Sequence, residues 1–192
     1  MKEKSYIKDN LELVEQTIAD ACHYVGRQRG EVTLTAVTKT VEPSIINEAI
    51  ACGVTHIGEN RVQEFLSKKP FLHLDGVRTH LIGHLQTNKV RQIVGEVSMI
   101  QSVDSLRLAQ AISQRAENNG ITLPILVEVN IGGEEQKSGV SPAEVERLLC
   151  DMSLLPGIQV RGLMTVAPIL HSETEKRALF SKMYDLFIDI RG

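Results

Sequence analysis

The chain has 192 residues, a net charge of -3 and 42% hydrophobic residues, values that suit one globular domain with a full core. No broad positive charge indicates nucleic acid as a partner, and no apolar run is long enough to predict a membrane span. The three cysteines, few and odd in number, and a charged start without an apolar run indicate a cytoplasmic protein with reduced thiols. Small molecules and other proteins remain as expected partners.

Strand and helix patterns alternate along the chain. An amphipathic helix at residues 7–25 precedes a β-branched strand. The predicted strands are 32–40, 54–57, 77–83, 97–103, 123–130 and 158–166. Predicted helices begin at 43, 61, 87, 104, 141 and 172. We expect Asp104 to cap the fourth of these, and capping boxes at Ser141 with Glu144 and at Ser172 with Glu175.

Six strands alternating with helices predict parallel pairing, in either an open doubly wound sheet or a closed barrel. Several strands end in polar residues, which is typical of a barrel whose strands all end at one shared rim. These residues are Lys39, Asn60, His84 and Asn130. No GxGxxG follows the first strand. We therefore predict an α/β fold, a (β/α)8 TIM-type barrel preceded by an N-terminal helix and here lacking the last two strands. Residues 1–192 would form one domain, apparently truncated at its C-terminus.

Lys39 is the first candidate for a functional side chain. It ends the strand VTLTAVTKT, and the carboxyl ends of parallel strands are where ligands gather in α/β proteins. Apolar neighbours can lower the proton affinity of such a lysine and make its amine a nucleophile. Alternatively, its stem packs on the rim while its ammonium stays in water. The strand alone leaves both interpretations open.

Five motifs, in matching order, resemble the pyridoxal phosphate homeostasis proteins, which are relatives of the barrel domain of alanine racemase. The motifs are AVTKT around Lys39, IGENRVQE (57–64), THLIGHLQTNK (79–89), VNIGGEEQKSG (129–139) and RGLMTV (161–166). The resemblance implies that the protein binds pyridoxal 5′-phosphate (PLP) as a Schiff base on Lys39. It also implies a role in vitamin B6 and amino-acid homeostasis without catalysis.

Three more residues are candidate cofactor contacts. Asn60 matches the family GEN motif and would hydrogen-bond the cofactor ring, or only close a strand-to-helix turn. Met164 matches RGLM and would pack on the ring, or only fill the core. His80 shares its strand face with Ile82, so it would face the barrel interior as a ligand contact or as a satisfied core histidine.

Other features of the sequence are weaker signals. Lys137 resembles a second family lysine near the rim, but we favour the interpretation that it is an exposed loop lysine. Metal binding is not indicated, because the histidines and cysteines show neither HExxH nor Cys-x-x-Cys spacing.

The resemblance also predicts what the chain lacks. The family continues with two strands that hold the cofactor phosphate, and none of this precedes Gly192. We therefore expect weak cofactor retention. The complete family form is expected to be a monomer that serves PLP-dependent apoenzymes.

Two other functions stay open. A racemase-like PLP enzyme or Schiff-base lyase would need an opposing acid or base such as a tyrosine, yet Tyr6, Tyr24 and Tyr184 all fall in predicted helices. The remaining alternative is an interaction module without a cofactor.

Overall fold

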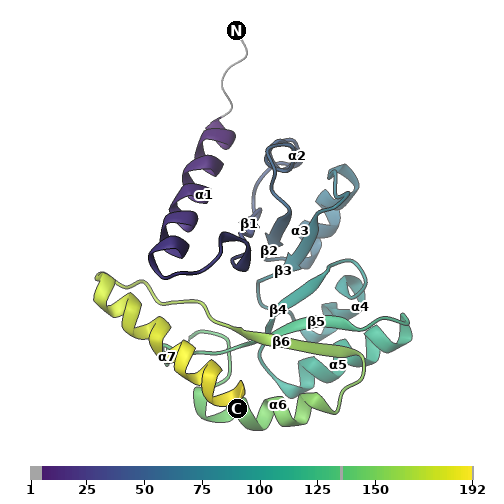
Figure 1. Ribbon diagram of the computed structural model, residues 1–192. Helices are drawn as coiled ribbons and strands as arrows, with labels where there is room; N and C mark the ends of the chain where they lie inside the picture. Colours follow the sequence, from purple (N-terminus) through teal and green to yellow (C-terminus); the bar gives the residue numbers. More distant parts are fainter. Residues whose placement is uncertain (1–5, 135, 192) are drawn as a thin grey trace. The chain divides into compact units, whose positions relative to one another are not determined.

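The computed structural model describes residues 6–134 and 136–191, and within them all six predicted strands are present (Figure 1). The strands are β1 (Ala36–Val37), β2 (His56–Glu59), β3 (Arg78–Leu81), β4 (Met99–Val103), β5 (Leu123–Glu128) and β6 (Ile158–Met164). The α-helices are α1 (Tyr6–Tyr24), α2 (Pro43–Ala51), α3 (Val62–Lys68), α4 (Val90–Ile93), α5 (Leu106–Asn118), α6 (Val145–Ser153) and α7 (Glu173–Arg191). Short 3-10 helices are η1 (Arg29–Glu31), η2 (Lys69–Phe71), η3 (Thr87–Lys89) and η4 (Pro142–Glu144).

The six strands follow one another in chain order through the sheet. Pairing is parallel between β1 and β2, and from β3 through β6. The α/β class and the parallel connections predicted from the sequence are therefore confirmed. By its contacts the chain divides into two compact units, which are described separately below. The first comprises the described parts of Met1–Glu59 with Gln63–Thr79, and the second comprises those of Asn60–Val62 with His80–Gly192.

The first unit is built around an apolar cluster beneath β1 and β2. Ile46 of α2 and Ile57 of β2 are each 1% exposed, and Leu11 of α1 packs against the same cluster. Pro43 occupies the first turn of α2. Backbone N–H groups there have no acceptor within the helix, so the missing N–H of proline breaks no hydrogen bond. After α2 the chain reverses at Gly53, whose φ of +109° favours glycine. The predicted helix and its glycine stop are thus confirmed.

Strand β1 is shorter than predicted, and strand β2 begins later than predicted. Only Ala36 and Val37 pair with β2, so the predicted strand 32–40 is mostly wrong. The reason is local: the carbonyl of Val32 accepts a hydrogen bond from the Arg29 guanidinium, and its N–H donates to the Arg29 carbonyl in η1. Similarly, β2 begins at His56 rather than at Val54, because the Val54 N–H closes the end of α2 on the Ala49 carbonyl.

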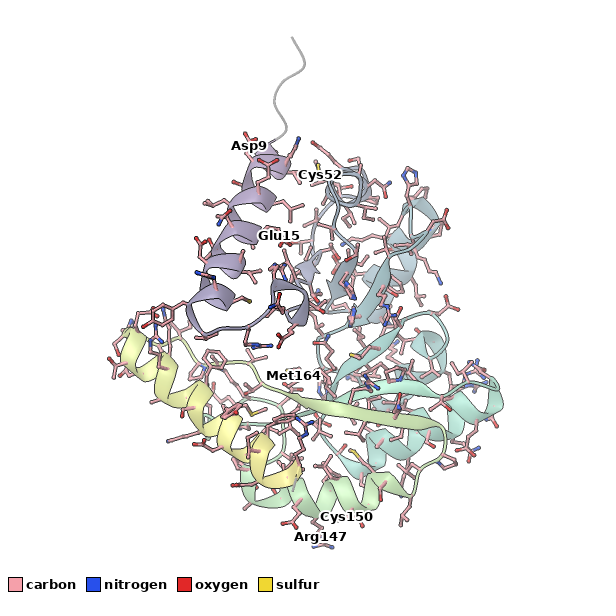
Figure 2. All side chains as sticks on the ribbon, viewed as in Figure 1. Asp9, Glu15, Cys52, Arg147, Cys150 and Met164 are labelled. Carbon is pink, nitrogen blue, oxygen red and sulfur yellow. The ribbon has the colours of Figure 1, made fainter. Side chains whose placement is uncertain are left out.

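In the second unit, helices α5 and α6 cover one face of the strands β4 to β6 (Figure 1). Helix α5 buries Leu108, Ile112 and Ala116, which recur at helical spacing on one side. The strand residues Ile125 and Val127 are fully buried on the covered face of β5. On α6, Arg147 and Cys150 point away from the sheet (Figure 2).

Helix caps in the second unit match the sequence with two exceptions. At Ser141 the predicted capping box is wrong, because the Ser141 hydroxyl donates to Glu144 Oε2 at 2.5 Å and caps no backbone N–H. Ser105, not Asp104, caps α5: its backbone is extended and its hydroxyl accepts the Leu108 N–H at 3.4 Å. The predicted box at α7 is confirmed, because Ser172 and Glu175 each bond the other's backbone N–H at 3.2 Å.

The pairing of the cysteines and the apolar character of the helices relate to the predicted cytoplasmic environment. All three cysteines are free, and Cys150 is exposed whereas Cys22 is buried. Among the residues that the structure describes, no helix combines the length and the apolar character needed to cross a bilayer.

Gly157 gives a test of the packing between β6 and α5. A Cβ at this position would lie 2.2 Å from the Ser113 carbonyl oxygen, and the Gly157 N–H donates to the buried Ser113 hydroxyl at 3.0 Å. We expect Gly157→Ala to lower the free energy of unfolding by about 2 kcal/mol, measured by urea denaturation. Gly30→Ala is the control, because no atom lies within 4 Å of its added Cβ. Equal urea midpoints for Gly157→Ala and wild type would contradict the close contact.

Candidate functional site

Lys39 lies in a turn two residues beyond β1, with its side chain exposed. The Val41 N–H donates to the Thr38 carbonyl at 3.1 Å and closes the turn. Thr38 is buried, whereas Thr40 has a φ of +60°, a left-handed conformation that is unusual for a β-branched residue. Lys39 is therefore an exposed residue of a constrained turn, rather than the last residue of a strand.

Beneath this turn lies a buried ionic cluster. The Lys68 ammonium donates to Glu59 Oε1 at 3.1 Å, to Glu64 Oε1 at 2.6 Å and to the Thr38 carbonyl at 2.8 Å. The Thr38 hydroxyl donates to Glu59 Oε1 at 2.7 Å. Burial by itself lowers the pKa of Lys68, but hydrogen bonds to Glu64 and Glu59 outweigh it and raise that pKa. Lys68 therefore stays charged and binds the backbone next to Lys39.

Asn60 directly follows β2, and its side chain offers an acceptor. The residue is half-buried, and its Oδ1 is buried without a hydrogen-bond partner among the described residues. Gly83 packs on its backbone so closely that an added Cβ would lie 2.4 Å from the Asn60 carbonyl oxygen. A buried amide oxygen without a partner costs stability, which is common at ligand sites. This atom is therefore suited to accept a hydrogen bond from a ligand.

His80 of β3 is 7% exposed, and its Nδ1 lies 3.0 Å from Gln101 Nε2 of β4. The contact fixes the position of the ring.

Met164 is the last residue of β6 and is half-buried (Figure 2). Its backbone carbonyl accepts the Val129 N–H at 2.8 Å, and in the ladder it lies opposite Glu128.

A second carboxyl group is buried at the end of β5. Glu128 is 8% exposed, and its Oε2 has no hydrogen-bond partner in the described structure. Burial raises the pKa of Glu128, the negative charge of Asp104 raises it further, and nearby His84 opposes the change. His84 Nδ1 lies 3.4 Å from Asp104 Oδ2. His84 and Asp104 follow the ends of β3 and β4, and Glu128 is the last residue of β5.

Lys137 is neither fully exposed nor free. Its side chain is 34% exposed, forms an ion pair with Glu134 and donates to the Ala167 carbonyl at 3.4 Å. It lines a cavity of about 260 Å³ together with Glu128 and Asn130. Among the described residues, no three or more histidine, cysteine or acidic side chains are grouped as a metal site.

The structure groups the predicted site residues by unit. Lys39 belongs to the first unit, whereas Asn60, His80 and Met164 belong to the second. Sequence reasoning missed Glu59, Lys68 and Glu128. For Glu59 and Glu128 the available signal was a lone glutamate at the end of an apolar strand, in HIGE and in LPILVE.

Comparisons with known proteins agree with this architecture. The family described as alanine racemase, N-terminal domain, matches residues 10–188. The pyridoxal phosphate homeostasis protein of Aquifex aeolicus (strain VF5) is 42% identical over 178 residues, which cover 93% of this chain and 78% of the relative. This chain belongs to the family of pyridoxal phosphate homeostasis proteins. The predicted family is therefore confirmed.

Solved structures support the same assignment and the TIM-barrel-like fold of six parallel strands. An unknown protein from Bifidobacterium adolescentis superposes with a TM-score of 0.88 and 40% identity, covering 94% of this chain and 77% of that one. PipY from Synechococcus elongatus PCC7942, solved with PLP bound, superposes with a TM-score of 0.78 and 33% identity. That match covers 91% of this chain and 82% of PipY.

The Glu128 carboxyl predicts a pH dependence of stability. Its folded pKa is raised, so the folded state holds a proton that the unfolded state loses near pH 4.5. The contribution of this group to stability is therefore greatest below pH 4.5 and falls as pH rises above that value. We expect Glu128→Gln to gain stability relative to wild type between pH 4.5 and 8, on the order of 1 kcal/mol.

Urea denaturation at several pH values measures this difference. Glu146→Gln, on the exposed side of α6, is the matched control. If the difference between Glu128→Gln and wild type stays constant with pH, the buried carboxyl does not hold its proton.

Proposed function

We propose that this protein binds PLP covalently through the amine of Lys39, as a Schiff base, and acts in vitamin B6 and amino-acid homeostasis. The observation that carries the proposal is the exposed side chain of Lys39 in a constrained turn just beyond β1. The carboxyl ends of parallel strands are the usual ligand-binding edge of such folds. PipY, solved with PLP bound, is a relative of this chain at 33% identity.

Lys39 is a better candidate than the nearby Lys68. A lysine attacks an aldehyde only as the neutral amine. Lys68 is buried, donates to three oxygen atoms and has a raised pKa, all of which keep it protonated. The exposed Lys39 side chain is accessible to a small molecule. Attachment is therefore expected at Lys39 and not at Lys68.

Asn60, His80 and Met164 are proposed as non-covalent contacts of the cofactor. When bound, PLP supplies a reactive aldehyde and an electron-withdrawing ring. The buried Asn60 Oδ1 without a partner fits such a group, because it can accept a hydrogen bond from a ring substituent. The thioether of Met164 can pack on a flat ring, and His80 is held in place by Gln101.

We further propose that the protein is a carrier or regulator and not an enzyme. Racemisation needs a second acid or base opposite the lysine. Tyr6, Tyr24 and Tyr184 all lie on helices and are 62% exposed or more, so none is held as a buried catalytic group. The recipients of the cofactor would be PLP-dependent apoenzymes, and the three free cysteines favour the cytoplasm as the site of action.

The attachment site can be tested by reduction and peptide mapping. We expect borohydride to trap PLP on Lys39, because this amine is exposed and its turn is constrained. Lys39→Ala should abolish the trapped adduct, whereas the control Lys137→Ala should retain it. An adduct on Lys89 or Lys137 in the wild type, with none on Lys39, would refute the assignment.

The absence of catalysis gives a second test. We expect no turnover of alanine, serine or threonine by the PLP-loaded protein, since Tyr6, Tyr24 and Tyr184 are exposed on helices rather than buried at a site. Enzymes of this kind commonly turn over at about 1 to 1000 per second, so chiral chromatography and ketoacid assays would detect weak activity. Turnover that disappears in Lys39→Ala would show that the protein is an enzyme.

A further inference from the structure

We propose that Glu59, Glu64 and Lys68 form a positioning cluster that holds the Lys39 turn in the geometry required for its reaction with an aldehyde. The inference rests on the proposed function of Lys39. It assigns a role to three side chains that belong to β2 and α3 and that do not themselves react. All of the contacts involved lie within the first unit of the chain.

The cluster binds the backbone on both sides of Lys39. On the N-terminal side, the Lys68 ammonium donates to the Thr38 carbonyl at 2.8 Å and the Thr38 hydroxyl donates to Glu59 Oε1 at 2.7 Å. On the C-terminal side, the Thr40 N–H donates to Glu64 Oε1. Because the same Glu64 oxygen also binds Lys68 at 2.6 Å, the two sides are linked through one ion pair.

The turn needs such support because of Thr40. Its φ of +60° is a conformation that a β-branched residue seldom adopts, so the free turn would favour other geometries. The hydrogen bond from its N–H to the Glu64 carboxylate is charge-assisted and offsets this preference. Residues held in strained conformations by their surroundings are common at sites where a side chain must be preorganised.

Burial makes the cluster a rigid support. Glu59 is 2% exposed, and the side chains of Lys68 and Glu64 are 11% and 21% exposed. Lys68 and Glu64 are four residues apart on α3, a spacing that usually gives a weak surface pair. Here the pair is largely removed from water, so its geometry is closely determined. Removing Lys68 alone would leave Glu59 as a buried charge without its cation, which endangers folding.

Glu64→Ala is the most direct variant, because it removes the acceptor of the Thr40 N–H and keeps the pair of Lys68 with Glu59. We expect the Thr40 amide, measured by NMR in the protein without PLP, to exchange with solvent about tenfold faster. We expect the rate of PLP attachment to Lys39, followed by absorbance and peptide mapping, to fall about tenfold. Glu64→Gln should restore both to within about threefold, since its amide oxygen can still accept the hydrogen bond.

Two further variants separate positioning from folding. Lys68→Met combined with Glu59→Gln removes the buried cation and carboxylate together, and we expect it to fold by circular dichroism yet to attach PLP as slowly as Glu64→Ala. Glu12→Ala is the control, because it breaks another i,i+4 pair of the first unit, with Lys8 at 3.7 Å and 66% exposure. It should leave both rates unchanged within about twofold.

The outcomes distinguish the two proposals. If the wild type attaches PLP to Lys39 and Glu64→Ala does so at the same rate, the positioning cluster is refuted while the proposed function stands. Faster exchange of Thr40 without slower attachment leads to the same conclusion. If the wild type never attaches PLP to Lys39, both the proposed function and this inference are refuted.

Discussion

The buried ammonium of Lys68 connects the elements on which the Lys39 turn depends. It joins the last residue of β2, the helix α3 and the carbonyl of Thr38, so a strand, a helix and a turn meet at one charge. Strand β1 has only two paired residues and cannot hold the turn by its own ladder. The Thr38 N–H still donates to the Gly58 carbonyl of β2 at 2.9 Å, and beyond Thr38 the hydrogen bonds of the cluster take the place of strand pairing. This explains how a short strand can end in a well-defined turn.

The order and type of the elements could be predicted because hydrophobic periodicity and turn residues are local signals. Pro43 and Gly53 mark the two ends of α2 in the sequence and in the structure. The extent of β1 could not be predicted, because Val32 has a β-branched side chain but its backbone bonds to η1. Composition favours a strand there, whereas hydrogen bonding depends on which partner is available.

The candidate site was predictable only in part. Lys39 and Asn60 stand out because they follow strand patterns and match family motifs. The partners of Lys39 were not predictable, since Glu64 and Lys68 at i,i+4 spacing are what an exposed helical face also shows. The contacts of Lys68 with Glu59 of β2 and with the Thr38 carbonyl turn this ordinary pair into a buried cluster. Lys68 and Thr38 are 30 residues apart in the sequence, so the contact between them could not be predicted from local patterns.

Glu59 and Glu128 are both the last residue of a buried strand, but they have different charged neighbours. Glu59 contacts the Lys68 ammonium at 3.1 Å, and the hydrogen bonds of this cluster raise the pKa of Lys68. Burial raises the pKa of Glu128 and the nearby Asp104 carboxylate raises it further, so folding favours the protonated form of this group. The turn that carries Lys39 is therefore held by a buried lysine cation, whereas the stability contributed by the end of β5 varies with pH.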